Sequence, residues 1–364
     1  MKKTQAYAII IAIVFSVVIL FAASVLYGLN FGDAGSDVSD GRSNVYGGAD
    51  APSFEMSRSI MGSIITISAA SDSSYVNLGA VVGDAFSDFS RIDALMSTYK
   101  NDSEVSRLNR DGVLVRPDPN TRLVIENAIV YSKLSNGSFD ITIKPVLDLW
   151  KEKVAAGTYP TDDELNATLR LVNFSNVTVA ADSISFKQEG MAITLDALAK
   201  GYGADRAVDA LIAGGVDHGF VNAGGDGVYF GGKSDGTSWN VALRNPDAKD
   251  DYITIISIYD GAVATSGNYE RYFSEEAKVS HISDPRTGKS SEKLISATVI
   301  VPYTTSMMMP AMTADALATA VFVMGVEGLD MIEMIDGAEA LVITNEREVI
   351  RTNGFWEYEE MMGE

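Results

Sequence analysis

Asp315 and Thr319 stand four positions apart in the segment Ala314–Thr319. On a helix, this spacing places a carboxylate and a hydroxyl on one face. Together with water and ligand oxygens, the two groups could hold Mg²⁺, which prefers oxygen ligands and often bridges to phosphates. The spacing alone favours a plainer structural role, in which Asp315 or Thr313 caps the start of the helix.

A second group of polar residues lies in Leu195–Gly203, where Asp196, several small residues and Lys200 occur together. We expect a strand to end and a helix to begin here. A helix N-terminus offers free N–H groups and the positive end of the helix dipole, which suits phosphate. The glycine spacing does not match the dinucleotide-binding fingerprint. A plain strand–helix junction is the structural alternative.

Other segments carry small or polar residues where packing alone would not demand them. Asp140 precedes an expected apolar strand, where its carboxylate would need partners. The consecutive glycines of Asn222–Gly227 would let the backbone approach a ligand closely, although Gly-rich hairpin turns are just as common. Met61–Ser63, taken alone, reads as a bend before a strand. The last two segments are Ala264–Tyr269 and His281–Gly288.

The composition of the chain excludes several classes of function. Its 364 residues include 28 Lys+Arg and 49 Asp+Glu, and the net charge of −21 argues against a nucleic-acid partner. The absence of Cys excludes disulfides, thiolate nucleophiles and iron–sulfur clusters. Two histidines, His218 and His281, cannot build a His-rich zinc or iron site. Any metal must therefore be held by oxygens.

The N-terminus carries an apolar run over residues 6–29 that follows Lys2 and Lys3. A bilayer core needs about 20 apolar residues, whereas the apolar region of a signal peptide has roughly 7 to 15. We therefore expect a transmembrane anchor, with residues 1–5 cytoplasmic and the rest of the chain on the outer face of the cell membrane. Cleavage after a small-residue stretch such as Ala22–Ser24 is the competing interpretation.

The run is followed by a segment rich in Gly, Ser and Asp over residues 30–53, which we expect to be a flexible tether because it has few large apolar side chains. Residues 54–364 show no repeat and no second linker, so they should form one domain. Expected helices and strands alternate along it, with several strands adjacent in sequence, which predicts an α+β fold with mixed or antiparallel sheets and flanking helices. The expected helices are Val82–Met96, Thr121–Leu134, one opening at Thr161, Gly201–Ala213 and Thr313–Met324; the expected strands are Ile60–Ile67, Val177–Ala180, Ile184–Lys187, Ala192–Leu195, Phe220–Asn222, Trp239–Leu243, Ile253–Ile258, Ala297–Val301 and Leu341–Thr344.

Eight segments in this order resemble the ApbE family of flavin transferases, also called FAD:protein FMN transferases. They are Met61–Ser63, Ser97–Asn109, Gly137–Trp150, Leu195–Asp205, Asn222–Asp226, Ala264–Phe273, His281–Gly288 and Ala314–Thr319. The likeness covers the chain from about residue 55 to residue 350. It implies a single ApbE-like, T-fold-like domain.

The resemblance also implies an activity. Members of the family bind FAD and Mg²⁺ and transfer FMN to a Thr or Ser hydroxyl of a target protein, releasing AMP. Typical targets are membrane redox subunits of the Rnf and Nqr kind. In this sequence the family pattern assigns Mg²⁺ to Asp315, Thr319 and the backbone carbonyl of Ala197.

The same pattern implies flavin contacts and candidate catalytic groups. His281 or Asp284 would accept the proton of the attacking hydroxyl, and Lys200 is the third candidate catalytic residue. The family commonly has an Asp at the position of Thr194, and Asp196 stands two residues later on what would be the same face of a strand. The implied FAD contacts are Met61, Tyr99, Phe139, Asp140, Ile141, Thr194, Asp196, Lys200, His281 and Ser283.

Two other functions fit the same sequence. With water in place of the target hydroxyl, the chain would hydrolyse FAD to FMN and AMP. A membrane-tethered flavin-binding or scavenging protein is the third interpretation, but storage would not require Asp315, Thr319 and Lys200 at the diphosphate. The sequence does not separate transfer from hydrolysis.

Overall fold

The computed structural model describes residues 43–46, 53–248, 251–267, 272–274, 279–280, 282–304 and 309–360. Within these residues, one large antiparallel sheet has the order β1-β2-β3-β7-β8-β11-β14-β15-β16. Each neighbouring pair in it is antiparallel. Its strands are β1 (Ser43–Tyr46), β2 (Ser53–Ile60), β3 (Ser63–Ala70), β7 (His218–Ala223), β8 (Asp226–Phe230), β11 (Gly261–Gly267), β14 (Leu294–Pro302), β15 (Glu339–Thr344) and β16 (Val349–Arg351).

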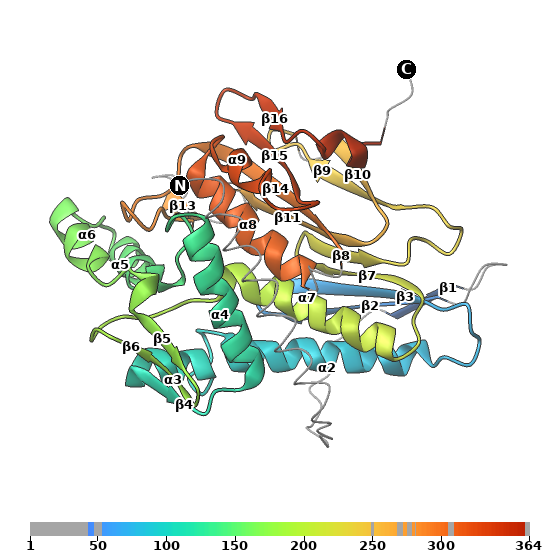
Figure 1. Ribbon diagram of the computed structural model, residues 1–364, viewed down its shortest axis with the longest axis horizontal. Helices are drawn as coiled ribbons and strands as arrows, with labels where there is room; N and C mark the ends of the chain where they lie inside the picture. Colours follow the sequence, from blue (N-terminus) through green and yellow to red (C-terminus); the bar gives the residue numbers. More distant parts are fainter. Residues whose placement is uncertain are drawn as a thin grey trace.

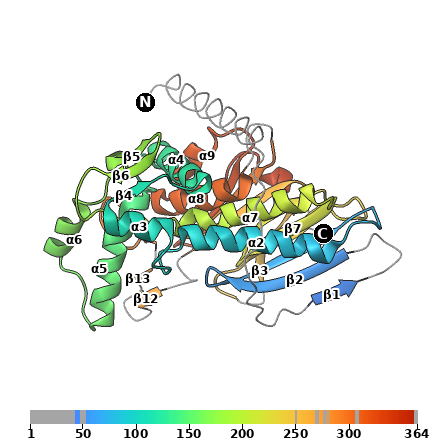
Figure 2. The ribbon, with the colours of Figure 1, turned by 90° about the horizontal axis from the view of Figure 1, so that it is seen from below.

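Helices cover one face of this sheet (Figures 1 and 2). The long helices α2 (Leu78–Met96), α7 (Asp196–Ala213) and α8 (Pro310–Met324) lie against it, and α4 (Pro119–Leu134) lies on their outer side. The remaining helices are α3 (Glu104–Asp111), α5 (Lys144–Ala155), α6 (Asp162–Leu169) and α9 (Gly328–Ile332), with 3₁₀ turns η1 (Ile141–Ile143), η2 (Phe174–Asn176) and η3 (Phe355–Tyr358).

The main core lies between the sheet and the helices. Phe86 and Phe89 of α2 are fully buried against Ile65 and Ile67 of β3 in this core. Burial of each such side chain stabilises the fold by about 1.5–3 kcal/mol. Alternation along β3 explains this placement, because every second residue of a strand points to the same face.

The opposite face of the sheet carries a second, smaller core beneath a separate hairpin. The hairpin consists of β9 (Trp239–Arg244) and β10 (Tyr252–Ile258). Leu243 and Ile256 from the hairpin pack with Val263 and Leu341 from the large sheet and with Phe355 from η3. The described residues also form two further small sheets. One consists of β4 (Val113–Val115), β6 (Ser183–Phe186) and β5 (Val177–Ala180), and the other of β12 (Tyr272–Ser274) and β13 (Val279–Ser280).

The expected fold class is confirmed as a single α+β domain with antiparallel sheets and flanking helices. The expected helices over 82–96, 121–134, 201–213 and 313–324 are present, each extended by a few residues at its start. The capping box that opens the helix after Thr161 is also present, with Thr161 and Glu164 bonded reciprocally.

The strands expected over residues 60–67 and 192–195 are wrong. Residues 60–67 do not form one strand, because Met61 and Gly62 both have positive φ, 52° and 67°, and turn the chain between β2 and β3. Residues 192–195 lie in no strand. The backbone of Ile193 is hydrogen-bonded by a side chain and not by a neighbouring strand. The Asn109 side chain accepts from the Ile193 N–H at 2.7 Å and donates to the Ile193 carbonyl at 2.8 Å.

The expected transmembrane helix over residues 6–29 lies outside the described residues, as does most of the expected tether over residues 30–53. The described part of that segment is not a tether, because Ser43–Tyr46 form β1, which pairs with β2, and β2 begins at Ser53. Among the residues that are described, no helix is long and apolar enough to cross a membrane. The membrane anchor therefore stays a prediction.

Candidate active site

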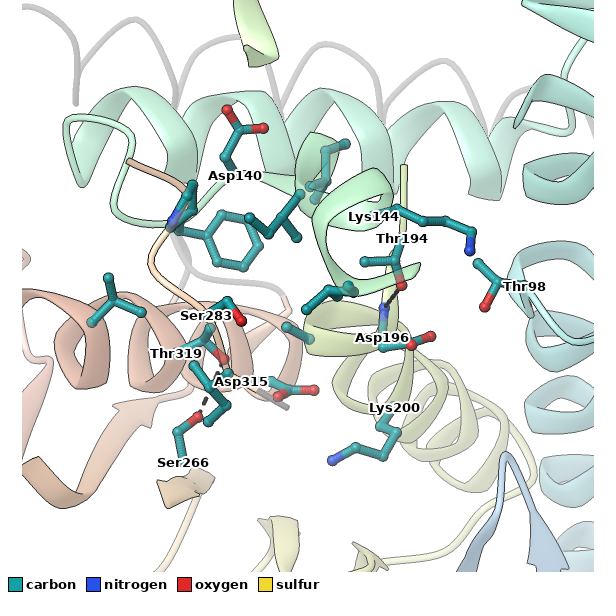
Figure 3. Close-up of a pocket in the computed structure, with 18 of the residues that line it drawn as sticks. Thr98, Asp140, Lys144, Thr194, Asp196, Lys200, Ser266, Ser283, Asp315 and Thr319 are labelled. Atoms are coloured by element: carbon teal, nitrogen blue, oxygen red, sulfur yellow. Dashed lines mark hydrogen bonds between the residues drawn. The ribbon is translucent and has the colours of Figure 1, made fainter. Parts of the chain in front are cut away.

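A cavity of about 460 Å³ opens beside the N-terminal halves of α7 and α8. Its size is in the range of pockets that bind cofactors and other small molecules. Its walls come from distant parts of the chain, and most of their side chains are polar around an apolar patch (Figure 3). The lining includes Ser63, Thr98, Tyr99, Phe139, Asp140, Ile141, Lys144, Lys151, Thr194, Asp196, Ala197, Lys200, Asp226, Thr265, Ser266, Ser283, Asp315 and Thr319.

Helix α8 supplies one wall of the cavity. Asp315 is 6% exposed, and Thr319 follows one turn later on the same face. The Thr319 hydroxyl shares a hydrogen bond with the Ser266 hydroxyl of β11 at 3.2 Å. The capping role that spacing alone favoured for Asp315 is wrong. The helix begins at Pro310, and its first free N–H groups are bonded by Asp205 of α7 instead.

Helix α7 supplies the facing wall. Ala197, in its first turn, departs from helical geometry with φ −87° and ψ 15°. The N–H of Gly201, whose regular acceptor would be the Ala197 carbonyl, donates to the Asp315 carboxylate at 3.3 Å. The lining of the cavity therefore brings together Ala197 at a helix kink, the buried carboxyl residue Asp315 and the hydroxyl residue Thr319.

These three oxygen groups fit Mg²⁺ better than a softer metal. Within the described residues, no three His, Cys, Asp or Glu side chains are grouped to hold a metal ion. An ion held on this wall would have the Asp315 carboxylate, the Thr319 hydroxyl and the Ala197 carbonyl as donors, and such oxygen donors suit Mg²⁺. Burial raises the pKa of Asp315 to about 7, with Lys200 acting to lower it and Asp226 to raise it. A divalent cation would offset the cost of burying this negative charge.

Lys200 extends from α7 toward the side of the cavity that holds Asp315 and Ser266 (Figure 3). Its ammonium lies 2.5 Å from a carboxylate oxygen of Asp226. The other Asp226 oxygen accepts from the backbone N–H of Thr265 at 3.0 Å. The Gly-rich segment Asn222–Gly227 contains this acid, but the predicted site residues do not include it. An acid directly after two glycines at the start of a strand was the available signal.

The apolar patch of the cavity is formed around Phe139 and Ile141. Asp140, between them, is buried, and its oxygens accept from the N–H and hydroxyl of Thr142 at 2.8 and 2.6 Å and from the N–H of Phe174 at 2.9 Å. Burial raises the pKa of Asp140, and these hydrogen bonds act against the rise. These bonds of Asp140 therefore stabilise the turn from which Phe139 and Ile141 contribute to the lining of the cavity. The strand expected after it is wrong, because η1 and α5 begin there, with Pro145 in the first turn of α5.

Thr194 and Asp196 both line the cavity, on the side where Thr98 and Lys144 also lie (Figure 3). The Thr194 hydroxyl accepts from the backbone N–H of Asp196 at 3.3 Å, at the start of α7. Its own N–H donates to the carbonyl of Ile141 at 2.9 Å. Thr194 thus ties α7 to the apolar patch, while the Asp196 side chain is exposed toward the cavity. Thr98, Lys144 and Ser266 were not singled out individually from the sequence.

The loop after residue 281 closes another side of the cavity. Ser283 is 6% exposed and lines the cavity, and its buried hydroxyl has no hydrogen-bond partner among the described residues. Asp284 is not among the described residues that line the cavity, and its carboxylate accepts from the Arg286 backbone and side chain at 2.7–2.9 Å. Burial acts to raise the pKa of Asp284, but the bonds from Arg286 outweigh it, and the net pKa is below its usual value. His281 lies outside the described residues.

Tyr99 and Met61 differ in exposure, because Tyr99 is largely exposed and Met61 is partly buried. Tyr99 lines the cavity with 79% of its surface exposed, and the ammonium of Lys151 lies 5.3 Å from its ring centroid. Met61 packs against the main core in the β2–β3 turn and is not among the described lining residues, whereas Ser63 is. The structure thus brings together the predicted residues on α7, α8 and the Phe139–Ile141 turn, and leaves Met61 and Asp284 aside.

The chain is similar to solved structures over most of its length. An ApbE protein from Thermotoga maritima superposes with a TM-score of 0.76 at 29% identity, covering 85% of this chain and 99% of that one. The flavin transferase ApbE from Vibrio cholerae gives a TM-score of 0.73 at 27% identity, covering 85% and 99%.

Sequence comparison gives the same relationship. A FAD:protein FMN transferase of Vibrio cholerae serotype O1 is 34% identical over 239 residues, which are 64% of this chain and 70% of the relative. One of Haemophilus influenzae is 29% identical over 305 residues, 80% and 82% of the two chains. The model described as "ApbE family" matches residues 61–342. With well over half of its length matched, this chain belongs to the ApbE family.

Proposed function

We propose that this chain is a FAD:protein FMN transferase, which moves FMN from FAD to a Thr or Ser hydroxyl of a target redox protein and releases AMP. The observation that carries the proposal is the cavity in which Asp315, Thr319 and Ala197 lie with Lys200. The names of the relatives support the same activity. In the reaction, the target hydroxyl attacks the phosphorus on the FMN side of the diphosphate, and the bond to AMP breaks.

The diphosphate would lie along the wall formed by α7 and α8. We assign Mg²⁺ to Asp315, Thr319 and the Ala197 carbonyl, where the ion would spread the negative charge of the phosphoryl oxygens. Lys200, held by Asp226, would add a second positive charge beside them. A chain with a net charge of −21 needs such local cations to accept an anionic substrate.

The flavin and adenine parts would occupy the rest of the cavity. Phe139 and Ile141 offer apolar surface, Tyr99 offers an exposed ring, and Thr194, Asp196 and Ser283 offer polar contacts. The ring of Tyr99 suits stacking on an aromatic ligand. Met61 does not line the cavity in this structure. It would contact the ligand only if the turn between β2 and β3 moved toward the cavity.

The attacking hydroxyl belongs to the target, so the chain itself needs a proton acceptor rather than a nucleophile. We propose His281 for this role ahead of Asp284. The carboxylate of Asp284 is fully engaged by Arg286, which lowers its pKa and with it its basicity.

We also propose that residues 6–29 anchor the enzyme in the cell membrane and that the part of the expected tether ahead of β1, residues 30–42, links the anchor to the domain on the outer face. The target would then be an extracytoplasmic or membrane redox subunit of the Rnf or Nqr kind. The length of the apolar run and Lys2 and Lys3 ahead of it support this arrangement.

A labelling experiment tests the proposed activity. The full chain in detergent is incubated with FAD, Mg²⁺ and a candidate redox subunit, and a Thr→Ala variant of that subunit serves as the control. In-gel flavin fluorescence on the wild-type subunit alone, with AMP release, is the expected result. Free FMN without labelling would identify a FAD hydrolase, and bound, unaltered FAD would identify a binding protein.

A further inference from the structure

Helices α7 and α8 cross with their backbones in direct contact at Gly201. A Cβ atom at this position would lie 2.4 Å from the carbonyl oxygen of Ala311 and 2.8 Å from the Cα of Met312. Both are backbone atoms, which cannot turn away as a side chain can. Gly201 is not among the glycines with positive φ, so the position requires the absence of a side chain and not an unusual backbone conformation.

A second contact fixes the same crossing one turn further along α7. Asp205 is 1% exposed, and its two oxygens accept from the backbone N–H groups of Ala311 at 3.0 Å and Met312 at 2.8 Å. The first N–H groups of a helix have no acceptor inside it, and the N-cap residue Met309 offers no side-chain bond. Asp205 therefore caps α8 from a neighbouring helix, where the helix dipole also favours its negative charge.

The crossing lies one helical turn away from two of the groups that we assign to Mg²⁺, one on each helix. Ala197 precedes Gly201 by one turn on α7, and Asp315 follows Ala311 by one turn on α8. The bond from the Gly201 N–H to Asp315 joins the two helices at this point. The distance between the Ala197 carbonyl and the α8 ligands is thus fixed by how closely the two backbones approach.

We infer that Gly201 and Asp205 are positioning residues, which set the spacing of the Mg²⁺ ligands across the α7–α8 crossing. The inference rests on the metal assignment in the proposed function. An added methyl at residue 201 must move the helices apart by about 1 Å to reach ordinary contact distance. Mg²⁺ demands near-ideal geometry at about 2.0–2.1 Å, so a shift of this size would separate its ligands.

Gly203 offers a matched control on the same helix. A Cβ atom there would meet the ring of Phe89 at 3.0–3.1 Å. This neighbour is a side chain on α2, so Gly203→Ala perturbs the packing of α7 without separating it from α8. Both substitutions replace a buried glycine in one helix, and only one of them lies at the crossing.

The test measures metal binding without flavin or turnover. The full chain in detergent is titrated with Mn²⁺, and the free ion is followed by its electron paramagnetic resonance signal, with competition by Mg²⁺. We expect Gly201→Ala to weaken Mn²⁺ binding at least about tenfold and Gly203→Ala to change it less than about twofold. Asp205→Asn keeps one acceptor oxygen and should weaken binding about threefold or more.

Melting temperature and circular dichroism of each variant separate positioning from folding. A purely structural cap would lower the melting temperature of Asp205→Asn and leave its Mn²⁺ affinity unchanged, which would overturn the inference. Wild-type affinity in a folded Gly201→Ala variant would overturn it as well. If Gly201→Ala does not fold, the Mn²⁺ affinity of Asp205→Asn alone tests the inference. A wild-type chain that binds no Mn²⁺ would overturn the metal part of the proposed function and this inference with it.

Discussion

The backbone N–H of Gly201 donates to the carboxylate of Asp315 across two helices, at 3.3 Å. The regular acceptor of that N–H would be the carbonyl of Ala197, which sits at a kink with φ −87° and ψ 15°. The bond therefore links the kink in α7 to the buried acid on α8. Ala197 and Asp315, two of the three residues assigned to the metal, are thus linked through Gly201. A substitution that moves either helix should therefore change the positions of both.

Replacement of Asp315 by Ala should abolish both FMN transfer and FAD hydrolysis. Loss of the metal would remove several kcal/mol of transition-state stabilisation, a decrease in rate of about a thousandfold or more. AMP release at saturating FAD and Mg²⁺ measures it. Asp330→Ala, which changes an exposed acid on α9, is the control and should retain full activity. Full turnover by the Asp315 variant would remove the metal assignment.

The stability of the metal-free protein should depend on pH through Asp315. Because burial raises the pKa of this group to about 7, the folded state keeps a proton that the unfolded chain has lost between about pH 4 and pH 7. The free energy of unfolding of the wild type, relative to Asp315→Asn, should therefore fall by a few kcal/mol as pH rises through this window. Urea unfolding in a chelator measures the difference, and added Mg²⁺ should reverse the trend near pH 7. A difference that is constant with pH would contradict the raised pKa.

Asp226→Asn should weaken both the fold and the binding of FAD. The substitution removes the charge beside the Lys200 ammonium, which lies in a partly buried pair with side-chain exposures of 23% and 13%. We expect a loss of about 1.5–3 kcal/mol in the free energy of unfolding and a rise in the KM for FAD. Asp247→Asn breaks a pair with Arg347 whose side chains are half exposed, and should cost less than about 1 kcal/mol. Equal effects of the two variants would argue against a special role for Asp226.

Ser283→Ala and Ser291→Ala should act in opposite ways. Both residues are 6% exposed in the same loop. The Ser291 hydroxyl donates to the carbonyl of Phe322 at 3.2 Å, whereas the Ser283 hydroxyl has no partner within the part of the chain that the structure describes. Ser291→Ala should lower the free energy of unfolding by about 1 kcal/mol and leave the KM for FAD unchanged. Ser283→Ala should leave stability unchanged or higher and raise the KM for FAD. An unchanged KM would exclude Ser283 from the flavin contacts.

Removal of residues 1–29 should release the protein from membranes without loss of transferase activity. The proposed anchor lies wholly in this segment, and the residues that line the cavity begin at Ser63. Cell fractionation followed by the labelling assay measures both properties. Mass spectrometry of the full-length protein distinguishes an intact anchor from cleavage near Ala22–Ser24. A processed chain found free in the soluble fraction would refute the anchor.

Periodic and capped segments could be predicted well from the sequence. The helix over Val82–Met96 repeats its apolar residues on one face, and the capping box at Thr161 is a local signal, so neither depends on distant parts of the chain. The pairing of Asp315 with Thr319 on one helical face also followed from spacing alone.

Features that depend on tertiary contacts could not be predicted in the same way. The carboxylate of Asp205 is bonded to α8, more than a hundred residues away, which is why the start of that helix could not be told from its own sequence. The backbone of Ile193 is hydrogen-bonded by the side chain of Asn109, so the apolar run over residues 192–195 does not form the expected strand. Asp226 joins the site through Lys200 of α7 and the Thr265 N–H of β11, contacts that no local pattern reveals.

The residues that line the cavity are spread along the sequence from Ser63 to Val323. During synthesis, the strands and α2 near the N-terminus emerge long before α8, which supplies the acid and hydroxyl of the last wall. A growing polypeptide therefore has no complete pocket until most of it has been made. If the chain is exported before it folds, as the proposed membrane anchor would allow, it crosses the membrane without bound flavin, and FAD has to reach it on the outer face.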